Sequence, residues 1–152
     1  FFHSSIDQKK KTTKTYDLFY PASGDPHKNH TILFKSLILL AKKNIYPKLL
    51  ITLNDNHYKK LDVLSLIKKY NLKITNHYFD NEIDIYNAYL KSKALIFPSL
   101  NETLGIPLYE ADYFNIKITM SNKLKLFKSN KNISYFNPYS EKSVSDAIIN
   151  II

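Results

Sequence analysis

Residues 97–111 of the chain read FPSLNETLGIPLYEA, and this stretch decides the fold. The pattern predicts a buried strand, a tight turn, and a helix whose first residues include a glycine and a proline. The free backbone N–H groups at the start of such a helix attract anions. Two carboxylates, Glu102 and Glu110, bracket the turn with seven residues between them. They are either exposed acids or two contacts to one ligand that extends along the helix.

Outside this stretch, short apolar segments alternate with segments of helical periodicity. We expect strands at residues 16–21, 48–53, 73–79, 94–97, 116–120 and 133–136. We expect helices at residues 30–44, 58–70 and 82–91, from the motif to near 115, and at 141–151. This alternation predicts an α/β fold, a Rossmann-like doubly wound parallel sheet of about six strands with helices on both faces.

The only two glycines of the chain, Gly24 and Gly105, follow the first and the fourth expected strands. Glycine is expected where the backbone takes a positive φ or lies against a ligand. A doubly wound sheet binds its ligand at the carboxyl ends of its strands, where the strand order reverses. We therefore expect the loops at residues 22–29 and 99–105 to face one crevice. Lys28 lies in the first of these loops.

The chain has 152 residues, of which 44% are hydrophobic, a composition typical of a globular domain. The length predicts one domain at residues 16–152, after a polar linker or frayed segment at residues 1–15. No cysteine is present, which excludes a disulfide framework and a thiolate metal site. No apolar run reaches the length that crosses a bilayer.

The net charge is +9, and all 22 basic residues are lysine. Proteins that bind nucleic acid use arginine for bidentate contacts to phosphate and guanine, so we expect no nucleic-acid partner. The abundance of Lys, Asn and Ile is typical of an AT-rich bacterial genome. Lysine clusters at residues 9–11 and 123–131 are candidate peripheral contacts to an anionic membrane.

Two further polar clusters suggest metal sites at first sight. His27 and His30 form a His-x-x-His pair, but without a supporting carboxylate or thiolate this is a weak metal pattern. Asn29 between them is favoured as the N-cap of the helix that begins at His30. We therefore expect no metal ion in this segment.

The second cluster, DNEID at residues 80–84, is either a cation-binding loop or an acidic helix start. We favour the helix start, with Asp80 as its N-cap. Tyr78 and Phe79 lie at the end of the expected third strand.

Residues 98–111 resemble the signature Pro-Ser-x-x-Glu-(Gly/Thr)-(Phe/Leu)-Gly-(Leu/Ile)-Pro-x-x-Glu-Ala of family 4, the retaining glycosyltransferases of the GT-B fold. Residues 20–30 resemble the Pro-x-x-Lys-(Gly/Asn)-x-x-x-Leu segment at the start of the C-terminal, donor-binding domain of that family. Lys28 is the matching lysine. Many members also have an arginine a few residues earlier, where this chain has Ala22 or Ser23. The resemblance extends from residue 16 to the end.

The resemblance implies a donor site for a nucleotide-diphosphate sugar, linked to UDP or GDP. Glu102 would contact hydroxyls of the transferred sugar, Lys28 would offset charge on the leaving phosphate, and Glu110 would accept hydrogen bonds from the ribose. Glu102 and Lys28 are then the catalytic candidates. The diphosphate or sugar would also lie against backbone N–H groups, those of Thr103, Leu104 and Gly105. Gly24 and Tyr78 are further donor-binding candidates, with Tyr78 and Phe79 placed to flank the nucleotide base. No metal or cofactor besides the donor is implied.

The function implied is a hexosyltransferase donor domain, retaining the anomeric configuration, in the synthesis of cell-surface polysaccharide, lipopolysaccharide or another glycoconjugate. The acceptor-binding N-terminal domain is expected outside this chain, which would then bind its donor without efficient transfer. We expect a cytoplasmic location, peripheral to the inner membrane. The alternatives are a nucleotide-sugar epimerase of GT-B type and a lysine-rich module that binds anionic surfaces.

Overall fold

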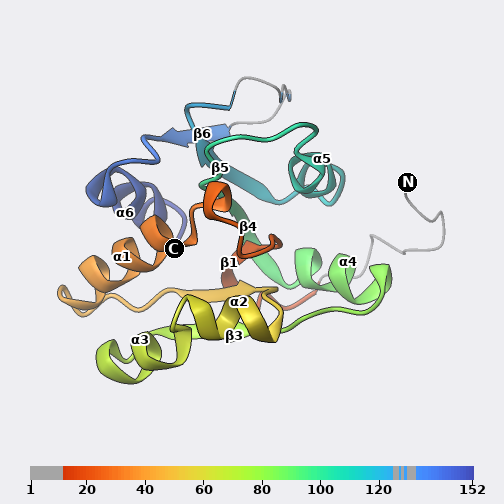
Figure 1. Ribbon diagram of the computed structural model, residues 1–152. Helices are drawn as coiled ribbons and strands as arrows, with labels where there is room; N and C mark the ends of the chain where they lie inside the picture. The colour runs from red at the N-terminus through yellow and green to blue at the C-terminus, as the bar shows by residue number, and fades with distance from the viewer. Residues whose placement is uncertain (1–11, 125–126, 128, 130–132) are drawn as a thin grey trace.

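The computed structural model describes residues 12–124, 127, 129 and 133–152 (Figure 1). Within them, six strands form one parallel sheet in the order β3-β2-β1-β4-β5-β6. The strands are β1 Tyr16–Tyr20, β2 Lys48–Ile51, β3 Lys73–Asn76, β4 Ser92–Phe97, β5 Lys117–Ser121 and β6 Ile133–Phe136. The predicted doubly wound parallel sheet is therefore confirmed.

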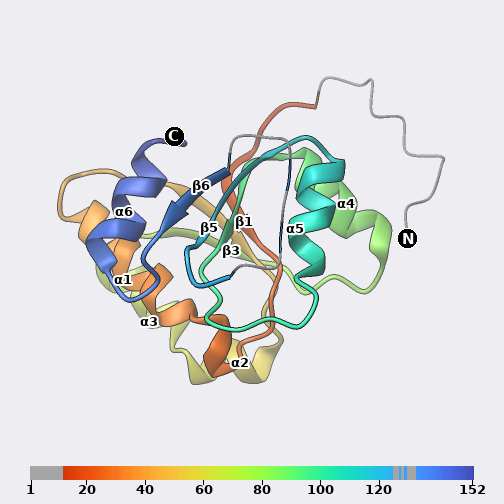
Figure 2. The same ribbon diagram turned by 90° about the horizontal axis from the view of Figure 1, so that it is seen from above.

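Helices cover both faces of this sheet. They are the 3₁₀ helix η1 Pro26–Lys28 and the α-helices α1 His30–Ala41, α2 Asp55–Lys60, α3 Val63–Tyr70, α4 Glu82–Leu90, α5 Ile106–Tyr113 and α6 Glu141–Ile149. Helices α1, α3 and α6 lie on one face, and α4 and α5 lie on the other (Figures 1 and 2). Helices lie in the connections from β1 to β2, β2 to β3, β3 to β4 and β4 to β5, and α6 follows β6, so the parallel strands are shielded on both sides.

The core is centred on β1 and β4, which pair in register with Leu18 opposite Ala94 and Phe19 opposite Leu95. Residues 18–20 of β1 and residues 94–97 of β4 are buried. A strand covered on both faces has no solvent side, so its apolar residues run continuously instead of alternating with polar ones. This is why the buried residues of the two central strands form continuous apolar runs, which end where the two loops begin.

The expected helix at residues 58–70 is wrong, because the segment forms two helices, α2 and α3. Asp62 takes a left-handed conformation, with φ of 53°, between them. The first of the two begins earlier than expected, since the Asn54 side chain caps it by accepting a hydrogen bond from the His57 N–H at 2.8 Å. The hydrophobic period continues across the break, so periodicity alone did not reveal it.

Asparagine side chains account for two further differences from the expected elements. The third strand ends at Asn76 instead of Phe79, and the Asn76 side chain bonds to both the N–H and the carbonyl of Leu53. Helix α4 is capped by Asn81, whose Oδ1 accepts from the Asp84 N–H at 2.9 Å, and not by Asp80. Each asparagine side chain thus forms hydrogen bonds with backbone groups beside a strand or helix end, and these groups would otherwise have no partner.

Residues 1–11 of the expected linker lie outside the described residues, as does most of the expected lysine cluster at residues 123–131. Next to the sheet, the Lys14 Nζ donates to the Leu90 carbonyl, and the Thr15 N–H donates to the Lys91 carbonyl. No helix in the described part of the chain is long and apolar enough to cross a membrane.

Candidate functional site

The strand order reverses between β1 and β4, and the loops after these two strands lie together. The Leu100 N–H donates to the His27 carbonyl at 2.8 Å. Asn29 follows η1 in a left-handed conformation and sends its side chain across, donating to the carbonyls of Pro98 and Pro138. The expectation that these two loops meet at the switch point is confirmed.

Asn29 does occupy the N-cap position of α1, as expected, but its side chain does not cap that helix. It clamps the β1 loop to two other loops instead. The physical reason is its φ of 61°, which turns the side chain away from the N–H groups of the helix and toward the neighbouring carbonyls.

The two loops bring Lys28 and Glu102 into direct contact. The Lys28 Nζ lies 2.5 Å from Glu102 Oε1, and the two side chains are only 19% and 11% exposed. The buried Ser99 hydroxyl lies 2.8 Å from the same carboxylate oxygen and donates to it. The Lys28 carbonyl accepts a hydrogen bond of 2.7 Å from the buried Tyr20 hydroxyl. Tyr20 of β1 thus holds the backbone of Lys28, and Glu102 pairs with its ammonium group.

Helix α5 begins at this place and points its N-terminus toward it. Gly105 precedes the helix with φ of 63°, a conformation that an L side chain rarely adopts. Thr103 and Leu104 lie in the turn ahead of the helix and are exposed, Leu104 by 65%. Their backbone, with that of the buried Gly105, therefore lies at the start of a helix dipole, where an anion is favoured.

Glu110 lies farther along α5, against α4. Its Oε2 accepts a hydrogen bond of 2.6 Å from the Tyr89 hydroxyl. Burial raises the pKa of the Glu110 carboxyl, the Tyr89 hydrogen bond lowers it, and the negative charge of Glu82 raises it further. A half-buried carboxylate with one neutral donor as its partner keeps lone pairs for further hydroxyl donors.

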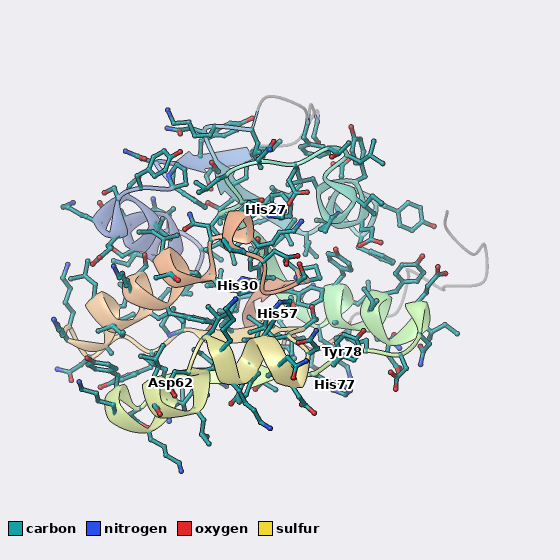
Figure 3. The ribbon with its side chains drawn as sticks, in the orientation of Figure 1. His27, His30, His57, Asp62, His77 and Tyr78 are labelled. Carbon is teal, nitrogen blue, oxygen red and sulfur yellow. The ribbon has the colours of Figure 1, made fainter. Side chains whose placement is uncertain are left out.

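Gly24 lies in the β1 loop against α2. Its N–H donates to His57 Nδ1 at 3.1 Å. A Cβ atom added at Gly24 would lie 2.5 Å from both the Cβ and the Cγ of His57, closer than atoms can approach. Close contact with His57 is therefore the reason for glycine here. Figure 3 shows His57 on α2 and His27 on η1, on the same side of the molecule.

We predict that Gly24→Ala destabilises the fold by about 1–3 kcal/mol, as overpacking does, and pushes the β1 loop off α2. His57→Ala opens the space that the new methyl group needs. The double variant Gly24→Ala with His57→Ala should therefore be more stable than the sum of the two single effects implies. Urea denaturation of the four proteins measures this coupling, and strictly additive effects would show that the contact does not matter.

Tyr78 does not join the Lys28–Glu102 pair. It lies in the loop between β3 and α4 with 62% of its surface exposed, near His77 (Figure 3). Beside it the rings of His77 and Phe79 stack with centroids 4.4 Å apart. Phe79 thus stacks on a histidine, whereas Tyr78 stays exposed, and the expectation that these two residues flank a base stays a prediction.

The two histidines of the His-x-x-His pair lie in different environments. His27 is exposed, whereas His30 is buried against the rings of Tyr20 and Phe34. Within the described residues, no group of three or more His, Asp or Glu side chains is arranged to hold a metal ion.

The sequence did not reveal four residues that shape the site. They are Tyr20, which holds the Lys28 carbonyl, His57, which contacts Gly24, Tyr89, which bonds Glu110, and Asn29 in its role as a clamp. Three of them act through contacts between distant parts of the chain, and Tyr20 acts across eight positions. Tyrosines inside apolar strands and helices are the one available signal, since a buried hydroxyl needs a partner.

Comparison with known proteins agrees with this geometry. The sequence matches the family described as "Glycosyl transferases group 1" over residues 2–152. Comparison with curated proteins gives no match. Many solved structures share the fold.

Among them, a glycosyltransferase from Rickettsia africae is 20% identical, with a TM-score of 0.74, and the match covers 92% of this chain and 38% of that one. The C-terminal domain of LpcC, a group 1 glycosyl transferase from Francisella tularensis, is 17% identical, with a TM-score of 0.72, and the match covers 94% and 78%. HepE from Anabaena, solved in complex with UDP, is 14% identical, with a TM-score of 0.66, and the match covers 89% and 38%.

The chain spans 38% of the length of the Rickettsia glycosyltransferase. It spans between 29% and 36% of the length of two structures of S. aureus TarM and one of a sucrose-phosphate synthase, which also share the fold. Its fold is that of one half of a GT-B enzyme. The Francisella structure contains this half alone, as a C-terminal domain. With its parallel six-stranded sheet and its match along almost the whole sequence, the chain belongs to the glycosyl transferases group 1 family and has the fold of its C-terminal domain.

Proposed function

We propose that this chain is the donor-binding domain of a retaining hexosyltransferase of family 4, which takes a nucleotide-diphosphate sugar. The observation that carries the proposal is the Lys28–Glu102 pair beside the N-terminus of α5, at the switch point of the sheet. A cation, a carboxylate and the backbone N–H groups that precede α5 at one place suit a ligand that has both phosphates and sugar hydroxyls.

In the proposed reaction, the bond between the anomeric carbon and the diphosphate breaks, and a bond between that carbon and an acceptor hydroxyl oxygen forms on the same face. The hydroxyl proton leaves with the nucleoside diphosphate. Lys28 and the N–H groups of Thr103, Leu104 and Gly105 stabilise the charge that develops on the leaving phosphate. Glu102 accepts hydrogen bonds from the transferred sugar, and Glu110 accepts them from the ribose.

The proposed chemistry needs no metal ion, because the charge of the leaving diphosphate meets a fixed cation and a helix dipole. Lys28 is well suited to this role, since the Tyr20 hydrogen bond fixes its backbone and its ammonium group lies at the site, paired with Glu102. The arginine that many family members add is replaced here by Ala22 or Ser23. We propose that backbone N–H groups take over the second phosphate contact.

We propose UDP as the first nucleotide to test. Two structural relatives support this choice: HepE was solved with UDP and glucose, and S. aureus TarM was solved with UDP. The acceptor would be a growing cell-surface glycan, a lipid-linked saccharide or another glycoconjugate, held by an N-terminal GT-B domain. The setting proposed is the cytoplasmic face of a bacterial inner membrane, with lysines touching anionic headgroups.

The test is calorimetric titration of the chain with UDP, GDP, ADP and their common sugar conjugates at two salt concentrations. We expect saturable binding of one nucleotide that persists at high salt. Lys28→Gln should weaken it about tenfold or more, whereas Lys35→Gln, which removes an exposed charge on α1, should not. Binding that falls steeply with salt and weakens equally in both variants would favour the lysine-rich anion-binding alternative.

A further inference from the structure

The Lys28 ammonium and the Glu102 carboxylate satisfy each other in the structure. Both side chains are largely buried, and the third member of the cluster, Ser99, is fully buried. Tyr20 fixes the carbonyl of Lys28, so the loop backbone stays in place while the lysine side chain moves. A phosphate that pairs closely with Lys28 must therefore take the ammonium group away from Glu102.

Glu102 would then keep the Ser99 hydroxyl as its donor from this cluster. Leaving a mostly buried carboxylate without its counter-ion is costly, because neither bulk water nor another charge compensates it fully. A hydroxyl of the sugar that is attached to the diphosphate removes this cost by donating to the carboxylate. The free nucleoside diphosphate lacks the transferred sugar and therefore has no hydroxyl at this end of the diphosphate.

We propose that the Lys28–Glu102 pair makes this site discriminate between an intact nucleotide sugar and the free nucleoside diphosphate. This inference rests on the proposed function. The phosphate takes the place of Glu102 as the partner of Lys28, and a sugar hydroxyl takes the place of Lys28 as the partner of Glu102. The binding of each group therefore makes the binding of the other easier. After transfer the sugar leaves Glu102, the carboxylate recovers the ammonium of Lys28, and the diphosphate is displaced. The pair thereby links loss of the sugar to release of the nucleotide.

The inference predicts an affinity that increases when a carboxylate is removed. Glu102→Gln keeps the size of the side chain and an oxygen that accepts from Ser99, but it no longer competes as an anion for Lys28. UDP should bind this variant about tenfold more tightly than it binds the wild type. UDP-glucose should gain less, so that the preference for the sugar-bearing ligand shrinks.

Asp17→Asn is the matched control. Asp17 pairs with Lys93 at 2.6 Å and joins the same two strands, β1 and β4, at their opposite end. The Asp17→Asn substitution removes one negative charge, as Glu102→Gln does, but at a position far from the switch point. The affinity for UDP should stay unchanged in this variant, which separates local competition from the effect of net charge.

A double-mutant cycle identifies Lys28 as the group for which Glu102 competes. In the Lys28→Gln background, Glu102→Gln should no longer strengthen UDP binding. Titration calorimetry on the folded chain, with thermal unfolding to confirm that each variant folds, measures all four proteins. Unchanged or weaker UDP binding by Glu102→Gln overturns the inference even if the wild type binds UDP. If the wild type binds no nucleotide or nucleotide sugar at all, the proposed function itself fails.

Discussion

Replacing Glu110 by glutamine should weaken nucleotide binding by about ten- to a hundredfold and make the free domain more stable at neutral pH. The binding loss follows because a charged acceptor of ribose hydroxyls becomes a neutral one, at a cost of about 1.5–3 kcal/mol. Glutamine keeps an oxygen that accepts from the Tyr89 hydroxyl, so the contact between α4 and α5 remains. The variant therefore tests the charge and not the packing.

The gain in stability follows from the direction of the pKa shift. Burial raises the pKa of Glu110 in the folded protein, so the folded state binds its proton more tightly than the unfolded state does. Stability is then lost as the pH rises through the raised pKa, and an ionised Glu110 disfavours folding at neutral pH. Glutamine cannot ionise, which removes this penalty.

Calorimetry with the nucleotide and urea denaturation at pH 7 measure both effects of Glu110→Gln. Glu141→Gln on α6, an exposed first-turn acid, is the control and should leave nucleotide affinity unchanged. Wild-type affinity in Glu110→Gln would remove this residue from the donor site. A lower stability with intact binding would assign it a structural role between α4 and α5 instead.

The second large effect that we expect is a loss of stability in mild acid that depends on one buried histidine. His30 is 2% exposed and lies against the rings of Tyr20 and Phe34, with centroids 4.8 and 5.9 Å away. Neither of its ring nitrogens has a hydrogen-bond partner in the structure. Burial, with the nearby His57 and Lys28, lowers its pKa to about 4.

The unfolded state takes up the His30 proton near its ordinary pKa of 6.5, whereas the folded state resists until about 4. Between these two pH values the unfolded state binds more protons, so stability falls as the pH falls. A shift of this size corresponds to about 3 kcal/mol once the pH is below both values. Since Tyr20 also holds Lys28, the loop at the site is expected to loosen as His30 becomes charged.

Urea denaturation at pH 7, 5.5 and 4 of the wild type and His30→Phe checks this expectation. Phenylalanine keeps an aromatic ring between Tyr20 and Phe34 and loses no hydrogen bond, so the decline between pH 6.5 and 4 should become about 3 kcal/mol shallower. His77→Gln, at an exposed position beside Phe79, should keep the wild-type decline. Identical pH profiles for wild type and His30→Phe would contradict the assignment.

The sheet was predictable from the sequence because its determinants are local. Apolar runs such as residues 94–97 and the turn at residues 98–105 specify strand, loop and helix over short distances, and alternation then selects parallel pairing. The break at Asp62 and the end of β3 at Asn76 were missed. A left-handed backbone conformation marks the first and side-chain hydrogen bonds mark the second, and the hydrophobic period records neither.

The sequence by itself determined the architecture and brought Lys28, Glu102 and Glu110 forward as candidates, because spacing and residue type carry that information along the chain. Only the tertiary structure decided the partners of these residues. It pairs Lys28 with Glu102 across 74 positions, sets Gly24 against His57, and joins Glu110 to Tyr89. Such contacts depend on which loops the strand order brings together, and their energies depend on burial, which a linear pattern does not contain.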